Sequence, residues 1–413
     1  MVLKVLIIGG GQVAAQILSL LQLSNQRFDI TLVSEECHLP YQRPPLSKSF
    51  FQPDFDRERL MFRDEVFYAT MGVTLRLGVR ATRIDRARSE VQLSSGELLT
   101  YDRLVLATGA RARLLRLPGA SFPNVCYLRS LDDAVKLSAY MRSNGRAVII
   151  GGGYVGLELA ASARKEGMEV VLLEAADRIL GRVASSAVSD AIATVHRANG
   201  VDLRTSATVV RFDGAQAAES VVLQDGKRIA ADLVVVGVGA VPNDELARDA
   251  GLEVDGGVIV DDAGCTSDPR IFAAGDCTCS FVSRLIRYVR YESVPHANEQ
   301  AKTIAAMLCE KPPQGFPPPW FWSEQYDVRL QMVGLMEGYD TSVIRHDPMS
   351  DGVAFTEFYI QNQQMIAAAS INCPKDFMVT RRALAVAPRP VDPSKLADLS
   401  VPLATTLAYQ EPA

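Results

Sequence analysis

A glycine-rich turn between an apolar strand pattern and a helical pattern occurs twice in this chain, and it limits the possible folds more than any other feature. In each turn, two glycines one residue apart are followed three positions later by a third small residue. Such a turn lets backbone N–H groups and a helix N-terminus approach the pyrophosphate of a dinucleotide. The fingerprint residues are Gly9, Gly11 and Ala14 in the first turn, and Gly151, Gly153 and Gly156 in the second.

An acidic residue follows the next strand pattern after each turn, where a carboxylate can accept hydrogen bonds from ribose hydroxyls. In the first unit this residue is Glu35, with the adjacent Glu36 as an alternative. In the second unit it is Glu174, whose charge would repel the 2′-phosphate of NADPH and therefore favours NADH. Arg178 and Arg182 lie nearby in the sequence and weaken that preference, with ordinary solvated side chains as the alternative interpretation of both.

The composition is that of a globular protein with two or three domains. The chain has 413 residues, 48% of them hydrophobic and 22% charged, and 43 basic against 48 acidic residues give a net charge of −5. A mildly acidic chain is a poor candidate for nucleic-acid binding. No apolar run reaches the roughly 18 residues that indicate a transmembrane helix, so we expect no membrane span.

The cysteines and histidines indicate neither a disulfide framework nor a metal site. The seven cysteines are scattered and contain no C-x-x-C motif, which argues against disulfides, a zinc ribbon and a four-cysteine iron–sulfur cluster. The four histidines show no metal-ligand spacing. Free thiols are typical of a reducing compartment and predict a cytoplasmic protein.

The region after the second unit indicates a further small domain. A proline-rich stretch over 311–319 marks a boundary, and strand patterns over 328–335 and 353–360 follow it. We therefore predict an α/β fold of two Rossmann-like dinucleotide-binding domains plus a C-terminal α+β domain. The predicted domains are 1–112 with 238–318, 113–237, and 319–413.

Six further motifs give the chain a resemblance to a known family. They are Ala107-Thr108-Gly109, Ala274-Gly275-Asp276, and the runs 40–48, 127–134, 292–295 and 319–326. Together with the two fingerprints, they make the chain resemble the FAD-dependent pyridine nucleotide-disulfide oxidoreductases, with their glutathione reductase-like fold. More narrowly, the chain resembles the NADH:ferredoxin reductases of bacterial oxygenase systems, the putidaredoxin reductase-like group, and the resemblance covers nearly the whole chain.

The resemblance implies that the discontinuous first domain binds FAD and that domain 113–237 binds NADH. The FAD-contacting positions that it implies are Gly9, Gly11, Val13, Ala14, Glu35, Arg43, Lys48, Ala81, Thr108, Gly109, Arg129, Asp276, Val294 and Trp322. The implied NAD-contacting positions are Gly151, Gly153, Tyr154, Gly156, Glu158, Glu174 and Arg182.

The resemblance also implies catalytic roles for Lys48 and Glu158. In the family, these two residue types meet beside the reactive nitrogen of the flavin, where an ion pair would adjust the flavin potential and shield the site from solvent. Without the surrounding motifs, Lys48 and Arg129 would be interpreted as surface cations. Glu158 alone would be interpreted as a carboxylate stabilised by the helix dipole.

The implied reaction transfers a hydride from NADH to FAD and passes single electrons to a 2Fe-2S ferredoxin. That ferredoxin would supply a haem monooxygenase or a Rieske-type oxygenase. An alternative on the same fold is an NADH-dependent reductase of a small one-electron acceptor such as monodehydroascorbate, or of a rubredoxin.

Two other classes fit the sequence less well. A thiol-based reductase needs a reactive cysteine close to the flavin. Cys37 lies outside the 40–48 motif and has no partner cysteine at C-x-x-C or C-x4-C spacing. A flavoprotein that acts mainly as an interaction module is expected to carry long additional or targeting segments, which the sequence lacks.

Ferredoxins are usually acidic, so we expect cations near the electron exit to steer the partner. The resemblance places Arg63 and Lys302 at basic positions of the family and Trp322 near the exit. Arg290, with Arg287 and Arg329, is a further candidate from its place in the motifs.

Overall fold

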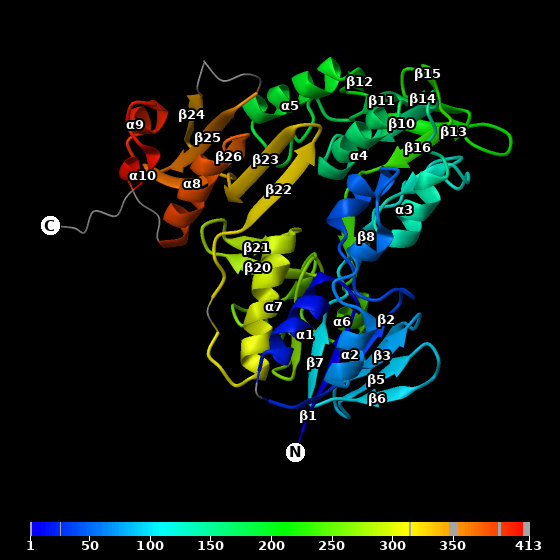
Figure 1. Cartoon of the computed structure of the whole chain (residues 1–413), viewed down its shortest axis with the longest axis vertical. Coiled ribbons are helices and arrows are strands. Elements are labelled where there is room, and N and C mark those ends of the chain that lie inside the picture. The colour runs from blue at the N-terminus through cyan, green and yellow to red at the C-terminus, as the bar shows by residue number, and fades with distance from the viewer. Residues whose placement is uncertain (1, 25, 314, 347–352, 387–389, 408–413) are drawn as a thin grey trace. The chain divides into compact units, whose positions relative to one another are not determined.

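The computed structural model describes residues 2–24, 26–313, 315–346, 353–386 and 390–407, and it contains two compact units (Figure 1). The first unit consists of residues 1–42, 56–111 and 241–319, and the second of residues 43–55, 112–240 and 320–413. The chain crosses between the units after residues 42, 55, 111, 240 and 319, and the third and fourth crossings fall within β8 (Ala110–Ala112) and β17 (Ala240–Pro242). Each unit is therefore assembled from three separate pieces of the sequence.

The first unit is built on a parallel five-stranded sheet in the order β19-β7-β1-β2-β3. Its strands are β1 (Leu3–Ile8), β2 (Phe28–Ser34), β3 (Thr74–Leu77), β7 (Arg103–Leu106) and β19 (Ile271–Ala273). Two three-stranded sheets accompany it, formed by β4 (Ala81–Asp85), β5 (Glu90–Leu93) and β6 (Leu98–Thr100), and by β18 (Val258–Ile259), β20 (Thr278–Val282) and β21 (Arg287–Val289). Its helices are α1 (Gln12–Gln22), α2 (Glu65–Met71), α6 (Glu245–Asp249) and α7 (Val294–Leu308), with a 3-10 turn at Arg57–Leu60.

The period-two geometry of β1 explains how this sheet buries both faces. Val5 and Ile7 pack into a core with α1, α2 and α7, whereas Leu6 and Ile8 pack into a second core with the β4–β5 hairpin and α6. The nearly continuous apolar sequence of β1 is the pattern expected for a strand covered on both sides.

The second unit is built on another parallel five-stranded sheet, in the order β12-β11-β10-β16-β9. Its strands are β9 (Val125–Tyr127), β10 (Arg146–Ile150), β11 (Glu169–Leu173), β12 (Val201–Arg204) and β16 (Leu233–Val236). The helices α3 (Leu131–Ser138), α4 (Tyr154–Lys165) and α5 (Ser186–Ala198) belong to this part, as do the antiparallel strands β13 (Val209–Asp213), β14 (Ser220–Leu223) and β15 (Arg228–Ala230). Two short 3-10 turns, Pro44–Ser47 and Ser49–Phe51, join it from the N-terminal part of the sequence.

The C-terminal residues form an antiparallel five-stranded sheet in the order β22-β23-β26-β25-β24. One face packs against the C-terminal helices, and the other shares a single hydrophobic core with α4, α5 and the parallel sheet of the same unit. The elements are β22 (Trp320–Gln325), β23 (Val328–Gly334), β24 (Thr341–His346), β25 (Phe355–Gln361), β26 (Gln364–Ile371), α8 (Pro374–Val386), α9 (Pro393–Ala397) and α10 (Leu403–Thr406).

These elements confirm the predicted fold class, with two Rossmann-like parts and a C-terminal α+β part. The division into three domains stays a prediction beside the two compact units. Residues 43–55 lie in the second unit although they come from the N-terminal part of the sequence.

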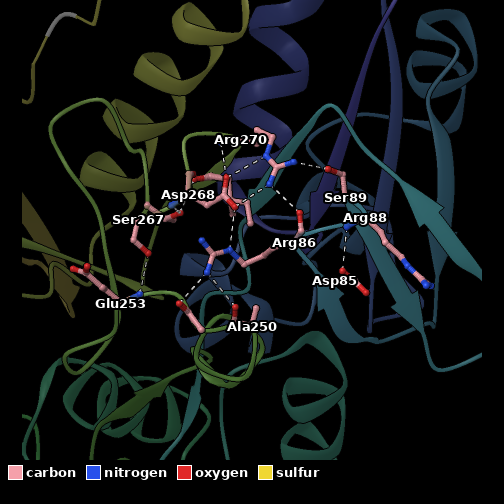
Figure 2. Close-up of polar contacts among 12 residues, drawn as sticks. Asp85, Arg86, Arg88, Ser89, Ala250, Glu253, Ser267, Asp268 and Arg270 are labelled. Atoms are coloured by element: carbon pink, nitrogen blue, oxygen red, sulfur yellow. Dashed lines mark hydrogen bonds and ion pairs between the residues drawn. The ribbon is translucent and has the colours of Figure 1, made fainter.

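A buried carboxylate fastens the β4–β5 hairpin to the loop that precedes β19 (Figure 2). Asp268, with its side chain 5% exposed, accepts a 3.0 Å bond from Arg86 Nε and a 3.3 Å contact from Arg270 Nη2. Arg270 also donates to Ser89 Oγ at 2.8 Å and to the Arg86 carbonyl at 2.9 Å. Burial raises the pKa of Asp268, but the hydrogen bonds from Arg270 and Arg86 outweigh burial and leave the pKa below its usual value.

We predict that Asp268→Asn lowers the free energy of unfolding by about 1–3 kcal/mol at pH 7, because a buried charge-assisted network loses its negative charge and one of its two acceptor oxygens. The pKa is lower in the folded than in the unfolded state, where it is about 3.9. The stabilisation is therefore present above that pH and is lost as pH falls through the folded pKa. Urea unfolding should show the difference from wild type shrinking below about pH 4.

Asp29→Asn, at an exposed position of β2, is the control and should change the free energy of unfolding by less than about 0.5 kcal/mol. Equal effects of the two substitutions at pH 7 would contradict the prediction.

Candidate functional site

The first glycine loop lies at the carboxyl end of β1 and opens α1. Gly9 has a φ of +115°, and a Cβ built there would overlap the Ala107 carbonyl oxygen, so this position requires glycine. Gly11 is the N-cap of α1 and makes no side-chain cap, and a Cβ built on it would meet no described atom within 4 Å. The loop therefore presents backbone N–H groups at a helix N-terminus beside open space.

The second loop repeats this geometry between β10 and α4. Gly151 has a φ of +107°, and a Cβ there would overlap the Gly237 carbonyl oxygen. A Cβ on Gly156 would overlap the carbonyl oxygen of Gly151, whereas Gly153, the N-cap of α4, again has no described atom within 4 Å of its Cβ position. Gly9 in the first loop and Gly151 and Gly156 in the second allow the backbone to pack closely, and in both loops the glycine at the helix start faces open space. This arrangement fits the pyrophosphate of a dinucleotide.

Glu174, at the carboxyl end of β11, has a role that the sequence interpretation missed. Its carboxylate accepts backbone N–H bonds from Gly152 at 2.6 Å and Ala176 at 2.9 Å, so it braces the glycine loop. Each carboxylate oxygen has a second lone pair with which to accept a ribose hydroxyl. Arg178 donates to the carbonyls of Ala184 and Gly181 at 2.7 and 3.0 Å, while Arg182 is exposed. The guanidinium of Arg178 is thus committed to its own loop.

The corresponding position of the first unit has two acidic residues in different surroundings. Glu36 accepts a 2.5 Å hydrogen bond from the Tyr41 hydroxyl and is half-buried, whereas Glu35 is exposed directly after β2. This difference favours Glu35 as the residue whose carboxylate faces a ribose.

Some of the other candidate FAD-contacting residues of the first unit lie in the loops that follow β7 and β19. Thr108 and Gly109 follow β7, and Asp276 follows β19, so their loops lie at the same carboxyl edge of the sheet as the first glycine loop. Asn243 holds the first of these loops, because its side-chain amide donates to the Thr108 carbonyl at 2.8 Å and its backbone carbonyl accepts a hydrogen bond from the Thr108 hydroxyl at 2.7 Å. Sequence reasoning did not single out Asn243.

Three further candidates of the first unit are placed by its helices and its small sheet. Val13 is buried on α1, Val294 is the first residue of α7, and Ala81 is the buried first residue of β4. Gln300 of α7 accepts the Gly275 N–H at 2.7 Å and so fixes the loop that carries Asp276.

The predicted pair of Lys48 and Glu158 is present in the second unit. Lys48 Nζ lies 2.9 Å from Glu158 Oε2. The Glu158 side chain is 5% exposed and the Lys48 side chain 20%, so Lys48 is the partner that solvent or a ligand can reach. Two serines complete the surroundings of the carboxylate, since Ser47 donates to Oε2 at 2.5 Å and Ser323 donates to Oε1 at 2.7 Å.

Both serines lie inside motifs that the sequence interpretation had marked, over 40–48 and 319–326, although neither was named as a site residue. Ser162 of α4 donates to the Ser47 carbonyl at 2.8 Å and fixes the turn that carries Ser47 and Lys48. The motifs therefore contained the signal, but a serine in a loop has no distinctive spacing from which its partner could be inferred.

The other candidates of the second unit are each placed by contacts within it. Arg43 donates to the Arg129 carbonyl at 2.6 Å. The Tyr154 ring packs on Phe321 with centroids 4.2 Å apart, and burial raises the pKa of its hydroxyl, which lies 3.1 Å from the Met332 sulfur. Trp322 is half-buried in β22, with its ring centroid 5.7 Å from that of Trp320.

Neither a metal site nor a membrane-spanning helix is found in the part of the chain that the structure describes. No group of three or more histidine, cysteine or acidic side chains there is arranged to hold a metal ion. Within the same residues, no helix is long and apolar enough to cross a bilayer.

Comparison with known proteins gives matches along nearly the full chain. The profile of the pyridine nucleotide-disulphide oxidoreductases matches residues 3–301, and the reductase C-terminal profile matches residues 320–407. Putidaredoxin reductase CamA of Pseudomonas putida is 42% identical over 412 residues, covering 98% of this chain and 97% of that protein. Rhodocoxin reductase of Rhodococcus erythropolis is 41% identical over 407 residues, covering 98% and 95%.

A solved structure agrees with these matches. A chain in the crystal structure of the covalent putidaredoxin reductase–putidaredoxin complex superposes with a TM-score of 0.94 at 40% identity, and the match covers 98% of this chain and 99% of that one.

We predict that Gly11→Ala and Gly153→Ala leave the fold intact but weaken dinucleotide binding, because the added methyl group occupies open space where a pyrophosphate would approach the backbone. Each should raise the dissociation constant of its own dinucleotide by about tenfold or more, or about 1.4 kcal/mol. Isothermal titration and thermal melting of the ligand-free protein measure the two effects separately.

Gly156→Ala is the control, because its methyl group meets the Gly151 carbonyl and should lower the melting temperature as well. Loss of the fold in Gly153→Ala would contradict the prediction that the methyl group is accommodated. Unchanged dinucleotide binding in this variant would show that the open space has no ligand role.

Proposed function

The chain belongs to the pyridine nucleotide-disulphide oxidoreductase family, and we propose that it is a FAD-dependent NADH:ferredoxin reductase of an oxygenase system. The observation that carries the proposal is the near-complete coverage, at about 40% identity, of relatives whose names describe reductases of putidaredoxin and rhodocoxin. In this reading the partner is a 2Fe-2S ferredoxin, which passes electrons to a haem monooxygenase or a Rieske-type oxygenase.

The cofactors of the family are FAD and NAD(P)H, and the two glycine loops fit one dinucleotide each. In the proposal, the first unit holds FAD through Gly11, Glu35 and Asp276, and the second holds NADH through Gly153 and Glu174. Bound FAD would supply the conversion between a two-electron donor and a one-electron acceptor. The protein's own contribution is to bind, orient and shield the reactants.

Lys48 and Glu158 are the proposed catalytic pair. Three donors surround the Glu158 carboxylate, namely the ammonium of Lys48 and the hydroxyls of Ser47 and Ser323, and they hold it in one orientation. The fixed carboxylate in turn fixes the Lys48 ammonium, which is the more exposed of the two groups and can present its charge to a ligand. A charge held in this way needs no rearrangement when the electron distribution of the ligand changes.

Glu174 supports the preference for NADH. Its carboxylate is fixed by two backbone N–H groups and would lie against a 2′-phosphate, while the nearby Arg178 is occupied by loop carbonyls. The site therefore presents the fixed negative charge of Glu174 to a 2′-phosphate. The Arg178 guanidinium, which is bonded to loop carbonyls, does not neutralise that charge.

The thiols argue against disulfide-reductase chemistry. Burial raises the pKa of Cys277 and raises that of Cys279 to about 11, which disfavours the reactive thiolate. Cys37 is exposed, and no cysteine of the chain forms a disulfide, all seven lying in the described ranges. The absence of disulfides supports the cytoplasm as the compartment in which we propose that the protein works.

The test of the proposed function is cytochrome c reduction by the purified yellow protein with NADH, with and without an added 2Fe-2S ferredoxin. We expect the ferredoxin to raise the rate many-fold and NADPH to be the poorer donor. Rubredoxin and the monodehydroascorbate radical are the comparison acceptors. Higher activity with either, or no response to any ferredoxin of an oxygenase system, would overturn the ferredoxin assignment.

The candidate docking cations of the first unit all have local partners. Lys302 Nζ lies 2.7 Å from Glu299 and is 50% exposed, Arg290 pairs with Glu292, and the Arg63 guanidinium lies 5.3 Å from the centre of the Phe67 ring. A paired surface cation still steers an acidic partner if it is exposed, and Lys302 meets that condition.

We predict that Lys302→Glu raises the Michaelis constant for ferredoxin by about three- to tenfold at low salt, with a smaller effect at high salt because the interaction is screened. The NADH–ferricyanide rate should stay within twofold of wild type. The matched control is Lys227→Glu, since Lys227 is 70% exposed and, like Lys302, pairs with a nearby carboxylate, that of Asp225 at 2.8 Å. An equal effect of both reversals would assign the change to net charge and not to docking.

A further inference from the structure

The polar contacts of Glu158 continue into the interior of the second unit as an unbroken line of hydrogen bonds. Ser323 Oγ, which donates to Glu158 Oε1 at 2.7 Å, lies 3.1 Å from Gln325 Nε2. Gln325 Oε1 lies 2.8 Å from His196 Nε2. The line therefore runs from the Lys48 ammonium through Glu158, Ser323 and Gln325 to His196 of α5.

Every member of the line beyond Lys48 is buried. Glu158 is 5% exposed, Gln325 is 2% exposed, and Ser323 and His196 are fully buried. An unpaired buried donor costs about 1–3 kcal/mol, which favours the arrangement in which each donor of the line has an acceptor. The members come from α4, β22 and α5, so the line joins three elements of this unit.

The charge of Glu158 fixes the direction of every bond in the line. An ionised carboxylate only accepts hydrogen bonds, so the Ser323 hydroxyl must donate to it. The lone pair of Ser323 is then left to accept from the Gln325 NH2 group. The Gln325 carbonyl therefore faces His196 and requires a proton on Nε2 of that imidazole.

The surroundings of His196 agree with this neutral tautomer. Its Nδ1 atom is buried and has no hydrogen-bond partner among the described residues, so a proton there would be an unpaired buried donor. Burial lowers the pKa of His196 and outweighs the hydrogen bond to Gln325. The imidazole also packs edge-to-face with the Tyr326 ring, with centroids 5.2 Å apart.

We propose that Ser323, Gln325 and His196 are positioning residues, which lock the Glu158 carboxylate and through it fix the Lys48 ammonium of the same unit in the orientation that the reaction needs. His196 prevents the Gln325 amide from flipping, Gln325 prevents the Ser323 hydroxyl from rotating away, and Ser323 keeps one of the three donors on Glu158. The effect of removing a member should therefore weaken with its distance from Glu158. This inference rests on the proposed function of the Lys48–Glu158 pair.

The experiment compares Ser323→Ala and His196→Phe in the FAD-loaded protein, with Glu158→Gln as the reference variant. Stopped-flow reduction by NADH should slow by about tenfold in Ser323→Ala and by a smaller factor, about two- to fivefold, in His196→Phe. The dissociation constant of NADH should change by less than twofold, and the visible absorption bands of the flavin should shift in the same order as the rates.

The matched control is Ser370→Ala. Ser370 is a serine of the same C-terminal sheet, 1% exposed, and it accepts a 3.0 Å hydrogen bond from Thr356; among the described residues, no hydrogen bond connects this pair to Glu158. Its removal should leave the flavin spectrum and the reduction rate within twofold of wild type. If Ser370→Ala changes both as much as Ser323→Ala does, the effect is one of general packing and the proposal is overturned.

A second readout is independent of activity. Nitrogen-15 NMR of the histidine rings should show His196 neutral and protonated on Nε2 at pH 7, with its signal identified by its loss in His196→Phe. A proton on Nδ1 would reverse the direction of the line and overturn the proposal.

The outcomes separate this inference from the function on which it rests. If Glu158→Gln alters the flavin spectrum and the reduction rate while Ser323→Ala and His196→Phe match the Ser370→Ala control, only the positioning role fails. If NADH does not reduce the wild-type protein, or if Glu158→Gln changes nothing, the proposed function of the pair fails and the inference falls with it.

Discussion

The close approach of two backbone segments at Gly9 and at Gly151 is the constraint on which the rest of this structure depends. At each position, a side chain would overlap the carbonyl oxygen of the segment that follows the neighbouring strand, after β7 in the first unit and after β16 in the second. The close contact sets the glycine loop against the carboxyl edge of its sheet. Because the glycine at the start of the following helix has no side chain, the N–H groups of the first helical turn are accessible to a ligand.

The same edge brings together residues that are distant in the sequence. In the first unit, the order β19-β7-β1-β2 places Asp276, Thr108, Gly11 and Glu35 after four adjacent parallel strands. The parallel arrangement alone brings these residues together, because the carboxyl ends of all its strands lie at one edge of the sheet. The second unit, like the first at Asp268, buries a carboxylate and must surround it with donors. Glu158 receives them from a 3-10 turn and from β22, which come from opposite ends of the chain.

The sequence was sufficient to predict features that depend on a local hydrophobic pattern or on a motif of several specific residues in a row. The two strand–turn–helix units, the C-terminal α+β part and the Lys48–Glu158 pair were all predicted, the last only through the resemblance. The sequence did not reveal that Glu174 braces its own glycine loop, because a carboxylate at a strand end has the same signature in either role. Asn243, Ser323 and His196 were missed because their partners lie far away in sequence. His196 in particular follows a pattern that fits any buried helix face.

The assembly of each unit from separated segments determines when the protein can fold during its synthesis. Residues 43–55 emerge early, but their unit also requires residues 320–413, and the first unit remains incomplete until residues 241–319 are made. At a synthesis rate of about 5–20 residues per second, the nascent chain carries unpaired strand edges and exposed apolar faces for many seconds. The protein is therefore built with a high contact order, and its vulnerable stage comes before its last strands leave the ribosome.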